Sequence, residues 1–198
     1  KLLLIIYIYI YIMSNYWDKR FLKHININNI NYICEVGSRY GNESIELSRI
    51  FTNANILAFE CNPNTINECK INLSNYNKIK FYNFGLGNKE EYIPFYPYIK
   101  NNVGASSFLK RIDFNNTQEV IENIQIRKLS SILKENNLNE INLLCLDVQG
   151  YELEVLKGCD EYLKNINYII MEEPKPIINK LYLPDNNYSK YLDAPSSY

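Results

Sequence analysis

The chain has 198 residues, 46% of them hydrophobic and 14% aromatic, which indicates one folded domain and excludes a disordered segment. Its 21 basic and 22 acidic residues nearly balance, so the composition argues against a charged surface for nucleic acid. Five scattered cysteines and a single histidine lack zinc-ligand spacing. We therefore predict no metal site and a reducing, cytoplasmic location.

The first twelve residues, KLLLIIYIYIYI, are apolar but short. A membrane-spanning helix needs about 20 apolar residues, and a signal peptide needs a cleavage site of small residues that does not follow here. A repeated AT dinucleotide also encodes alternating Ile and Tyr, which favours a natural start at Met13. We predict an N-terminal segment over residues 1–31, no packing for residues 1–12, and a surface position for His24.

A regular alternation begins at residue 32. NYICEV (31–36) and residues 54–60 are short apolar runs typical of buried strands, and residues 79–84 form a third. A helix is predicted between each pair: residues 42–52, with Asn42 or Ser44 as the cap, and from Asn62 or Asn64 to about residue 76. This alternation predicts parallel strands joined by right-handed crossovers.

Residues 90–129 are different, because they are extended, polar and interrupted by proline. Pro94 and Pro97 exclude a central strand, so we predict irregular β-structure such as a hairpin or flap. A short helix should follow over residues 131–137, capped by Ser130 or Ser131.

The pattern of a parallel sheet then returns. INLLCLDV (141–148) predicts a buried strand, residues 150–165 an amphipathic helix, and NYIIMEE (167–173) a fifth strand. No linker or repeat interrupts the chain, so we predict one α/β domain over residues 32–192 with a tail at 193–198.

Acids and glycines follow the predicted strands, and in an open α/β sheet ligands bind at the carboxyl ends of the strands. The first turn, GSRYG (37–41), lacks the lysine of a P-loop and the middle glycine of a dinucleotide fingerprint. Glu60, at the end of the second strand, suits ribose hydroxyls. These features indicate a nucleoside ligand without a pyrophosphate, and S-adenosylmethionine is the first candidate.

Five motifs together resemble the FkbM-type methyltransferases. They are ExGxxxG at 35–41, FECNP at 59–63, NFGLGN at 83–88, GASSF at 104–108 and, most distinctive, LDVQGYELEVLKG at 146–158. The resemblance implies a class I, Rossmann-like fold with strand order 3-2-1-4-5. It also implies S-adenosylmethionine-dependent transfer of a methyl group to an oxygen of a small molecule, sugar or lipid, with no nucleic-acid partner and no membrane span.

The resemblance also implies roles for individual residues. The methionine part of the cofactor would pass Glu35, Gly37, Ser38, Tyr40 and Gly41; Glu60 would hold the ribose, with Cys61 and Asn62 beside the adenosine; and Phe84, Gly85 and Leu86 would flank the adenine. Asp147 would lie near the transferred methyl group and is the candidate catalytic base, while Ser106 and Ser107 would lie on the substrate side. Replacing Glu60 with alanine should then weaken cofactor binding at least tenfold with little change in the stability of the apo protein.

The chain departs from the family pattern in several places. Glu35 stands where the family usually has Asp, Arg39 where it often has Asn, and Gln149 where it often has Glu. Five strands are predicted where the complete fold has seven, so the last two are apparently missing and residues 167–173 would form an exposed edge through which chains could associate. Two alternatives therefore stay open: a truncated, noncatalytic relic of the fold, and a nucleotide-binding oxidoreductase.

Overall fold

The central sheet has six parallel strands. The structure, a computed structural model, describes residues 6–10, 22–98, 103–110 and 121–172. The strands are β1 (Ile6–Ile10), β2 (Tyr32–Val36), β3 (Asn55–Phe59), β4 (Ile79–Tyr82), β8 (Leu143–Leu146) and β9 (Tyr168–Glu172), in the spatial order β1-β9-β8-β2-β3-β4. The five predicted strands correspond to β2, β3, β4, β8 and β9. Read from β4 to β9, they lie in the order 3-2-1-4-5, which confirms the prediction.

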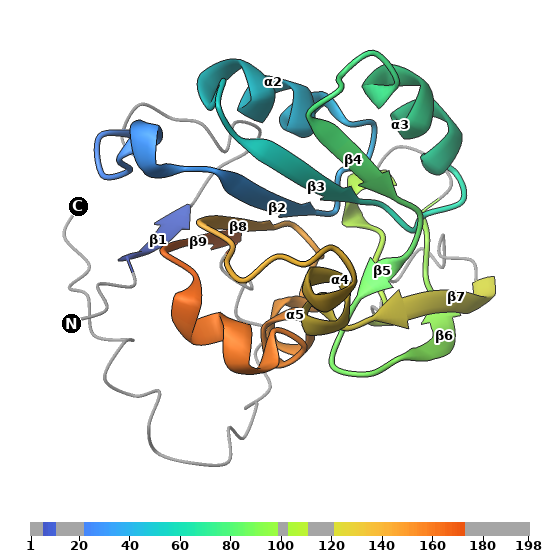
Figure 1. The fold of residues 1–198 in the computed structure, drawn as a ribbon. Coiled ribbons are helices and arrows are strands. Elements are labelled where there is room, and N and C mark those ends of the chain that lie inside the picture. Colours follow the sequence, from blue (N-terminus) through green and yellow to red (C-terminus); the bar gives the residue numbers. More distant parts are fainter. Residues whose placement is uncertain (1–5, 11–21, 99–102, 111–120, 173–198) are drawn as a thin grey trace, which may run out of the picture.

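Helices cover both faces of this sheet (Figure 1). On one face lie α2 (Asn42–Ile50) and α3 (Ile66–Leu73); on the other lie α4 (Leu129–Glu135), α5 (Glu152–Lys157) and the 3₁₀ helix η3 (Asp160–Asn165). Neighbouring strand residues point to opposite faces, so Ile33 packs in the α2–α3 core and Cys34 in the α4–α5 core. Burial on both faces explains why these strands read as continuous apolar runs. A short 3₁₀ helix, η1 (Ile27–Asn29), precedes β2.

All four predicted helices have different limits in the structure. The N-cap residues of α2 and α3 are Gly41 and Thr65, so the predicted caps at Asn42 or Ser44 and at Asn62 or Asn64 are wrong. The helix predicted over residues 150–165 is interrupted at Gly158, where a Cβ would stand 2.0 Å from the Gly87 carbonyl oxygen. The helix predicted from residue 131 begins at Leu129, with Lys128 as the N-cap residue and no side-chain cap. The predicted cap at Ser130 or Ser131 is therefore wrong, because Ser130 lies inside the helix and its hydroxyl donates to Asp160 instead.

A second, three-stranded sheet lies beside the first. It consists of β5 (Gly85–Leu86), β6 (Glu91–Phe95) and β7 (Ile121–Arg127), with β7 in the middle. The strand predicted over residues 79–84 ends at Tyr82, because the chain changes sheets there. Pro94 lies on the edge strand β6 within a register shift between Ile93 and Phe95, which confirms the irregular β-structure predicted from the prolines.

The N-terminal strand corrects one prediction. Residues 6–10 form β1, which pairs in parallel with β9 from Ile6 opposite Tyr168 to Ile10 opposite Glu172. The expectation that residues 1–12 do not pack is therefore wrong, and β9 is not an exposed edge because β8 and β1 flank it. The predicted association of chains through residues 167–173 required an exposed edge strand, and the structure does not support it. The predicted tail, residues 193–198, lies outside the described residues.

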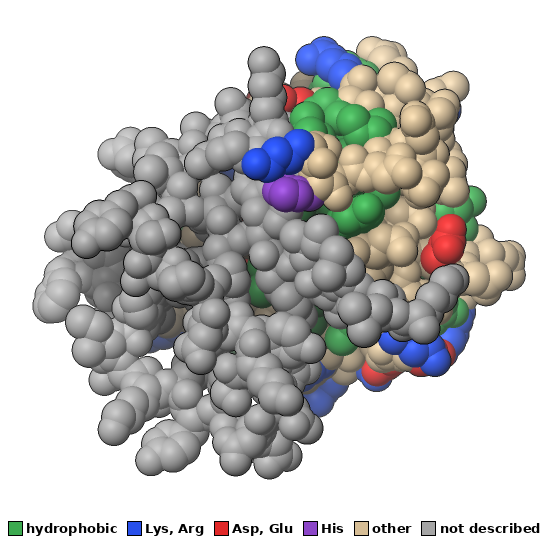
Figure 2. Space-filling view, turned by 90° about the vertical axis from the view of Figure 1, so that its left-hand side faces the viewer, with side chains coloured by type: hydrophobic (Ala, Val, Ile, Leu, Met, Phe, Trp, Pro, Cys, Tyr) green, Lys and Arg blue, Asp and Glu red, His purple; other side chains and the backbone are tan. Residues whose placement is uncertain are grey.

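Figure 2 shows the side of the molecule that faces left in Figure 1. His24 is exposed there, as predicted from the sequence. In the described parts of the chain, no helix combines the length and the apolar character needed to cross a bilayer.

Candidate active site

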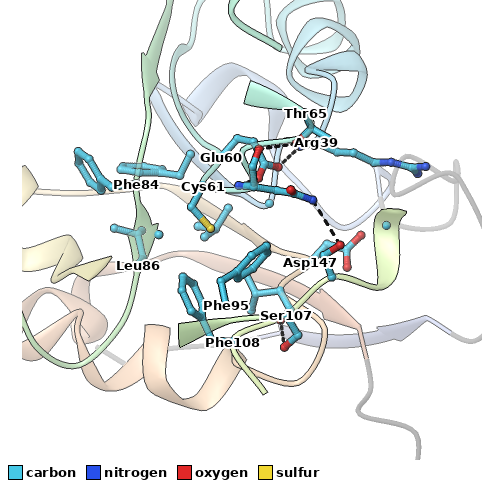
Figure 3. A pocket seen from close by; sticks show the side chains of 18 of the residues that line it. Arg39, Glu60, Cys61, Thr65, Phe84, Leu86, Phe95, Ser107, Phe108 and Asp147 are labelled. Carbon is cyan, nitrogen blue, oxygen red and sulfur yellow. Dashed lines mark hydrogen bonds between the residues drawn. The ribbon is translucent and has the colours of Figure 1, made fainter. Parts of the chain in front are cut away.

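A pocket opens where the carboxyl ends of β2, β3 and β8 meet the second sheet. The empty space in it, including open solvent at its mouth, is about 750 Å³. Figure 3 shows Phe84 and Leu86 at one end, Arg39 and Asp147 at the other, and Glu60 and Cys61 between them. The lining residues are Val36, Gly37, Arg39, Glu43, Phe59, Glu60, Cys61, Asn62, Thr65, Phe84, Gly85, Leu86, Phe95, Val103, Gly104, Ser106, Ser107, Phe108, Asp147 and Val148.

Gly37 begins the turn after β2 and has a backbone that only glycine adopts easily. Its φ is +95°, and a Cβ would stand 2.1 Å from the Asp147 carbonyl oxygen. The N–H groups of Gly37 and Ser38 both donate to the Phe59 carbonyl at 3.0 Å, and the Asp147 N–H donates to Val36 at 3.0 Å. The glycine therefore lets the ends of three strands meet, which brings Glu60 and Asp147 to one pocket.

Glu35 lies beneath this turn and does not line the pocket. Its carboxylate oxygen Oε2 accepts a hydrogen bond from Ser44 at 2.5 Å and another from Ser38, so it ties the turn to the first residues of α2. Burial raises the pKa of Glu35 to about 8, against the opposing effect of the two serine donors. Ser38, Tyr40 and Gly41 also lie outside the lining set; Gly41 (φ +83°) packs against Leu73.

The raised pKa of Glu35 predicts how stability depends on pH. The folded chain keeps the Glu35 proton up to about pH 8, whereas the unfolded chain loses it near the ordinary value of 4.5. The free energy of unfolding should therefore fall as pH rises between these values, by up to roughly 1.4 kcal/mol per pH unit. Urea unfolding from pH 5 to 9 measures this slope. Glu35→Gln should reduce this slope to the part that Glu60 contributes, since the pKa of Glu60 is also raised, to about 7. An identical slope in that variant would assign the whole effect to other groups.

Glu60 occupies the middle of the pocket and is 8% exposed. Its Oε2 accepts the Arg39 N–H at 2.6 Å and its Oε1 accepts the Asn62 N–H at 2.6 Å. Burial raises its pKa to about 7, although backbone N–H donors act in the opposite direction. Because each carboxylate oxygen has two lone pairs, the group can accept further hydrogen bonds from ligand hydroxyls.

The two ends of the pocket differ in chemistry. Phe84 packs at a tilt on Phe59, with ring centroids 5.8 Å apart, and the Arg127 guanidinium carbon lies 5.4 Å from the centre of its ring. This end is aromatic and apolar and suits a flat ring. Cys61 lies nearby, and burial raises the pKa of its thiol well above the usual range, so the thiol is neutral and a poor nucleophile. At the other end, Asp147 Oδ1 accepts from Gln149 Nε2 at 2.6 Å.

Ser106 and Ser107 line the pocket, but their hydroxyls are engaged with the protein. Ser106 Oγ donates to the Val103 carbonyl at 2.7 Å and accepts from the Tyr98 N–H at 3.0 Å and Asn62 Nδ2 at 3.3 Å. Ser107 Oγ donates to the Gln149 carbonyl at 3.0 Å. The two serines thus fasten the segment with η2 (Val103–Ala105) to the ends of β3 and β8.

These contacts predict the effect of removing one hydroxyl. Ser106→Ala leaves the Tyr98 N–H and the Asn62 amide without this acceptor, so the free energy of unfolding should fall by about 1–3 kcal/mol. Chemical denaturation measures the change. Ser48→Ala is the matched control, because the half-buried Ser48 hydroxyl donates within α2, to the Ile45 carbonyl, and to no other described residue. Equal stabilities of the Ser106 variant and the unmodified chain would contradict a fastening role.

Sequence reasoning missed several lining residues, among them Glu43, Thr65, Phe95 and Phe108. Glu43 follows the glycine turn by two residues, and Phe108 is the last residue of the GASSF motif. Both could therefore have been predicted as lining residues from these motifs. Phe95 had no such signal, because only the second sheet brings it to the pocket, 5.0 Å from Phe108 between ring centroids. Within the described ranges, no three His, Cys, Asp or Glu side chains group closely enough to hold a metal ion.

Comparison with known proteins identifies the family. The model of the methyltransferase FkbM domain matches residues 35–186, which is more than half of the chain. The chain belongs to the FkbM methyltransferase family. This membership removes the nucleotide-binding oxidoreductase from the alternatives.

Individual relatives are distant. Methyltransferase 1 of Beauveria bassiana is 30% identical over 159 residues, covering 72% of this chain and 64% of that protein. The hexuronic acid methyltransferase AglP of Haloferax volcanii is 28% identical over 157 residues, covering 74% of this chain and 59% of that protein. The 2-O-methyltransferase NoeI of Sinorhizobium fredii is 22% identical over 155 residues, covering 71% of this chain and 62% of that protein. The chain thus spans about three fifths of the length of these relatives.

One solved structure is also similar. It is the crystal structure of methyltransferase FkbM from Methylobacillus flagellatus KT, which is 15% identical, with a TM-score of 0.42 and coverage of 66% of this chain and 29% of that one.

Proposed function

We propose that this protein binds S-adenosylmethionine in the pocket and transfers its methyl group to an oxygen atom of a sugar, a lipid or another small molecule. The observation that carries the proposal is the position of the buried Glu60 carboxylate between an aromatic end and a polar end of one pocket. That sequence of surfaces matches a ligand with a flat base, a ribose and a charged amino-acid part.

The residues present fit the parts of this cofactor. Phe84 and Leu86 would flank the adenine, beside Gly85, where an added Cβ would stand 2.6 Å from the Phe108 ring. Glu60 would accept from the ribose hydroxyls through its remaining lone pairs, beside Cys61 and Asn62. The turn from Gly37 would pass the methionine part, while Glu35, Ser38, Tyr40 and Gly41 would support that turn from outside the lining. The bound cofactor supplies an electrophilic methyl group.

The protein's own contribution to transfer would be alignment and proton removal. Asp147 lies at the polar end with one oxygen bonded to Gln149, and its other oxygen is directed to no hydrogen-bond donor within the described residues. We assign it as the candidate base that receives the acceptor's hydroxyl proton. Ser106 and Ser107 would act by holding the substrate-side segment in place.

The acceptor class is inferred from relatives. Two of them are named as a hexuronic acid methyltransferase and a 2-O-methyltransferase, which supports a hydroxyl of a sugar or sugar-like molecule. All five cysteines are free thiols, which supports the reducing environment of the cytoplasm.

Two measurements test the proposal. Calorimetry with S-adenosylhomocysteine should show binding to one site, and a radiolabelled methyl group should be transferred to members of a sugar and glycolipid panel. Binding without transfer to any member would indicate the noncatalytic relic. Absence of binding would contradict the proposal as a whole.

A further inference from the structure

Arg39 is the one basic side chain among the residues that line the pocket, where the other charged groups are Glu43, Glu60 and Asp147. Like Asp147, it lies at the end of the pocket opposite Phe84 (Figure 3). In contrast to the buried Glu60, Arg39 is exposed. Among the described residues, Arg39 is therefore the positive charge that a ligand in the pocket would meet.

The backbone holds Arg39 at this place. Its N–H donates to Glu60 Oε2 at 2.6 Å, and its φ is +50°, in the left-handed region that disfavours residues with a branched or long side chain. Glycine or asparagine would adopt this conformation more easily. Unfavourable backbone geometry in a pocket is more often found where the side chain has a function.

The side chain is also directed by its surroundings. The guanidinium carbon lies 5.0 Å from the centre of the Tyr40 ring, and Nη1 lies 3.1 Å from the point where a Cβ on Gly104 would stand. Arg39 thus reaches from the turn after β2 to η2, across the polar end of the pocket. The absence of a side chain at Gly104 leaves space for the guanidinium.

No carboxylate of the described residues forms an ion pair with Arg39. The ion pairs there involve Arg127, Lys128, Lys134 and Lys157. Among the acids that line the pocket, Glu60 accepts two backbone N–H groups and Asp147 accepts from Gln149, while Glu43 is attracted to Arg39 electrostatically without an ion-pair contact. The guanidinium fork is therefore available to a ligand, and its geometry matches a carboxylate through two parallel hydrogen bonds.

We propose that Arg39 binds the carboxylate of a ligand at the polar end of the pocket. The inference rests on the proposed function, which places ligands there. Two sources supply this chemistry: the amino-acid part of the cofactor, and an acceptor that carries a carboxylate, such as a uronic acid.

Two pairs of probes separate these sources. S-adenosylhomocysteine and 5′-methylthioadenosine differ in the amino-acid part, which the second lacks. Glucuronic acid and glucose, added in the presence of S-adenosylhomocysteine, differ in the carboxylate. Affinities are measured by calorimetry for the first pair and by ligand-observed NMR for the second, in the unmodified chain and in Arg39→Gln. Arg49→Gln is the charge-matched control, because Arg49 is exposed on the same helix–turn unit but does not line the pocket.

We expect Arg39→Gln to bind the carboxylated member of one pair at least tenfold more weakly than the unmodified chain does. Its affinity for the carboxylate-free member of that pair should stay within twofold of the unmodified chain. The pair affected identifies the source, and Arg49→Gln should change neither pair. Arg39→Asn should show the same loss. Because asparagine adopts the left-handed backbone easily, a loss in this variant would arise from the missing guanidinium and not from a folding defect. Equal affinities for all four probes, or equal losses within both pairs, would overturn the inference. Absence of S-adenosylhomocysteine binding to the unmodified chain would instead overturn the proposed function.

Discussion

Replacing Gly37 with alanine should reduce the free energy of unfolding by roughly 2–6 kcal/mol, a large part of the total stability of a domain. Two costs combine. A non-glycine residue at φ +95° costs about 1–3 kcal/mol. The added Cβ would stand 2.1 Å from the Asp147 carbonyl oxygen, and relief of such overpacking costs about 1–3 kcal/mol more. Because the neighbour is backbone, β2 and β8 must move apart.

Gly150→Ala is the matched control for this prediction. Gly150 has a similar φ of +102°, but a Cβ there would meet only a Leu109 methyl carbon at 3.2 Å, at the end of a flexible side chain. It should therefore show the conformational cost alone, about 1–3 kcal/mol. Chemical denaturation of both variants makes the comparison. If the two lose the same stability, the close approach of β2 and β8 is not a determinant of the fold.

Loss of S-adenosylhomocysteine binding should accompany the Gly37 substitution. The turn from Gly37 and the backbone of Asp147 form adjacent parts of the pocket wall, so separation of β2 from β8 alters the polar end. Binding is measured at a temperature where the variant stays folded by circular dichroism. Full affinity in a folded Gly37→Ala variant would show that the proposed cofactor site tolerates this movement.

The central sheet could be predicted because its physical signal is local. Parallel strands buried on both faces, such as residues 143–146, are continuous apolar runs, and the helices between them have a 3.6-residue period. Glu60 and Gly37 could be located because each stands directly after such a strand. Topology then places those strand ends at one edge of the sheet.

Other features depend on contacts that no local pattern encodes. The break at Gly158 arises because a residue 71 positions earlier, Gly87, approaches its Cα. The role of Ser130 depends on Asp160, and the pairing of β1 with β9 joins opposite parts of the chain. The Ile–Tyr repeat of β1 fits a coding artefact and a strand-forming sequence equally well, so composition alone does not predict this strand.

Glu60→Ala should destabilise the apo protein by roughly 2–6 kcal/mol, which overturns the expectation from sequence that only cofactor binding would suffer. The reason is that both carboxylate oxygens accept backbone N–H groups, from Arg39 and Asn62. Leaving a buried donor without its acceptor costs about 1–3 kcal/mol for each group. Glu60→Gln keeps one acceptor oxygen and should lose about half as much. Thermal and urea unfolding of the two apo variants provide the measurement.

The same substitutions should weaken S-adenosylhomocysteine binding at least tenfold, since each lost hydrogen bond to a charged acceptor is worth about 1.5–3 kcal/mol. The 2′-deoxy analogue supplies the control. If Glu60 binds the ribose, the unmodified chain prefers the parent compound, and Glu60→Gln loses that preference. A preference that survives in the variant would assign ribose recognition to another residue.

The pKa of Glu60 adds a dependence on pH. Burial raises this pKa to about 7, so the carboxyl is largely protonated at pH 6 and largely ionised at pH 8. The ionised form has more lone pairs for ribose hydroxyls, so affinity for S-adenosylhomocysteine should rise with pH through about 7 and level off above 8. Binding should in turn lower the pKa of Glu60. Calorimetry between pH 6 and 8.5 in two buffers of different ionisation enthalpy would detect the released proton. A flat affinity profile, with no proton released, would show that the Glu60 carboxylate does not contact the ligand.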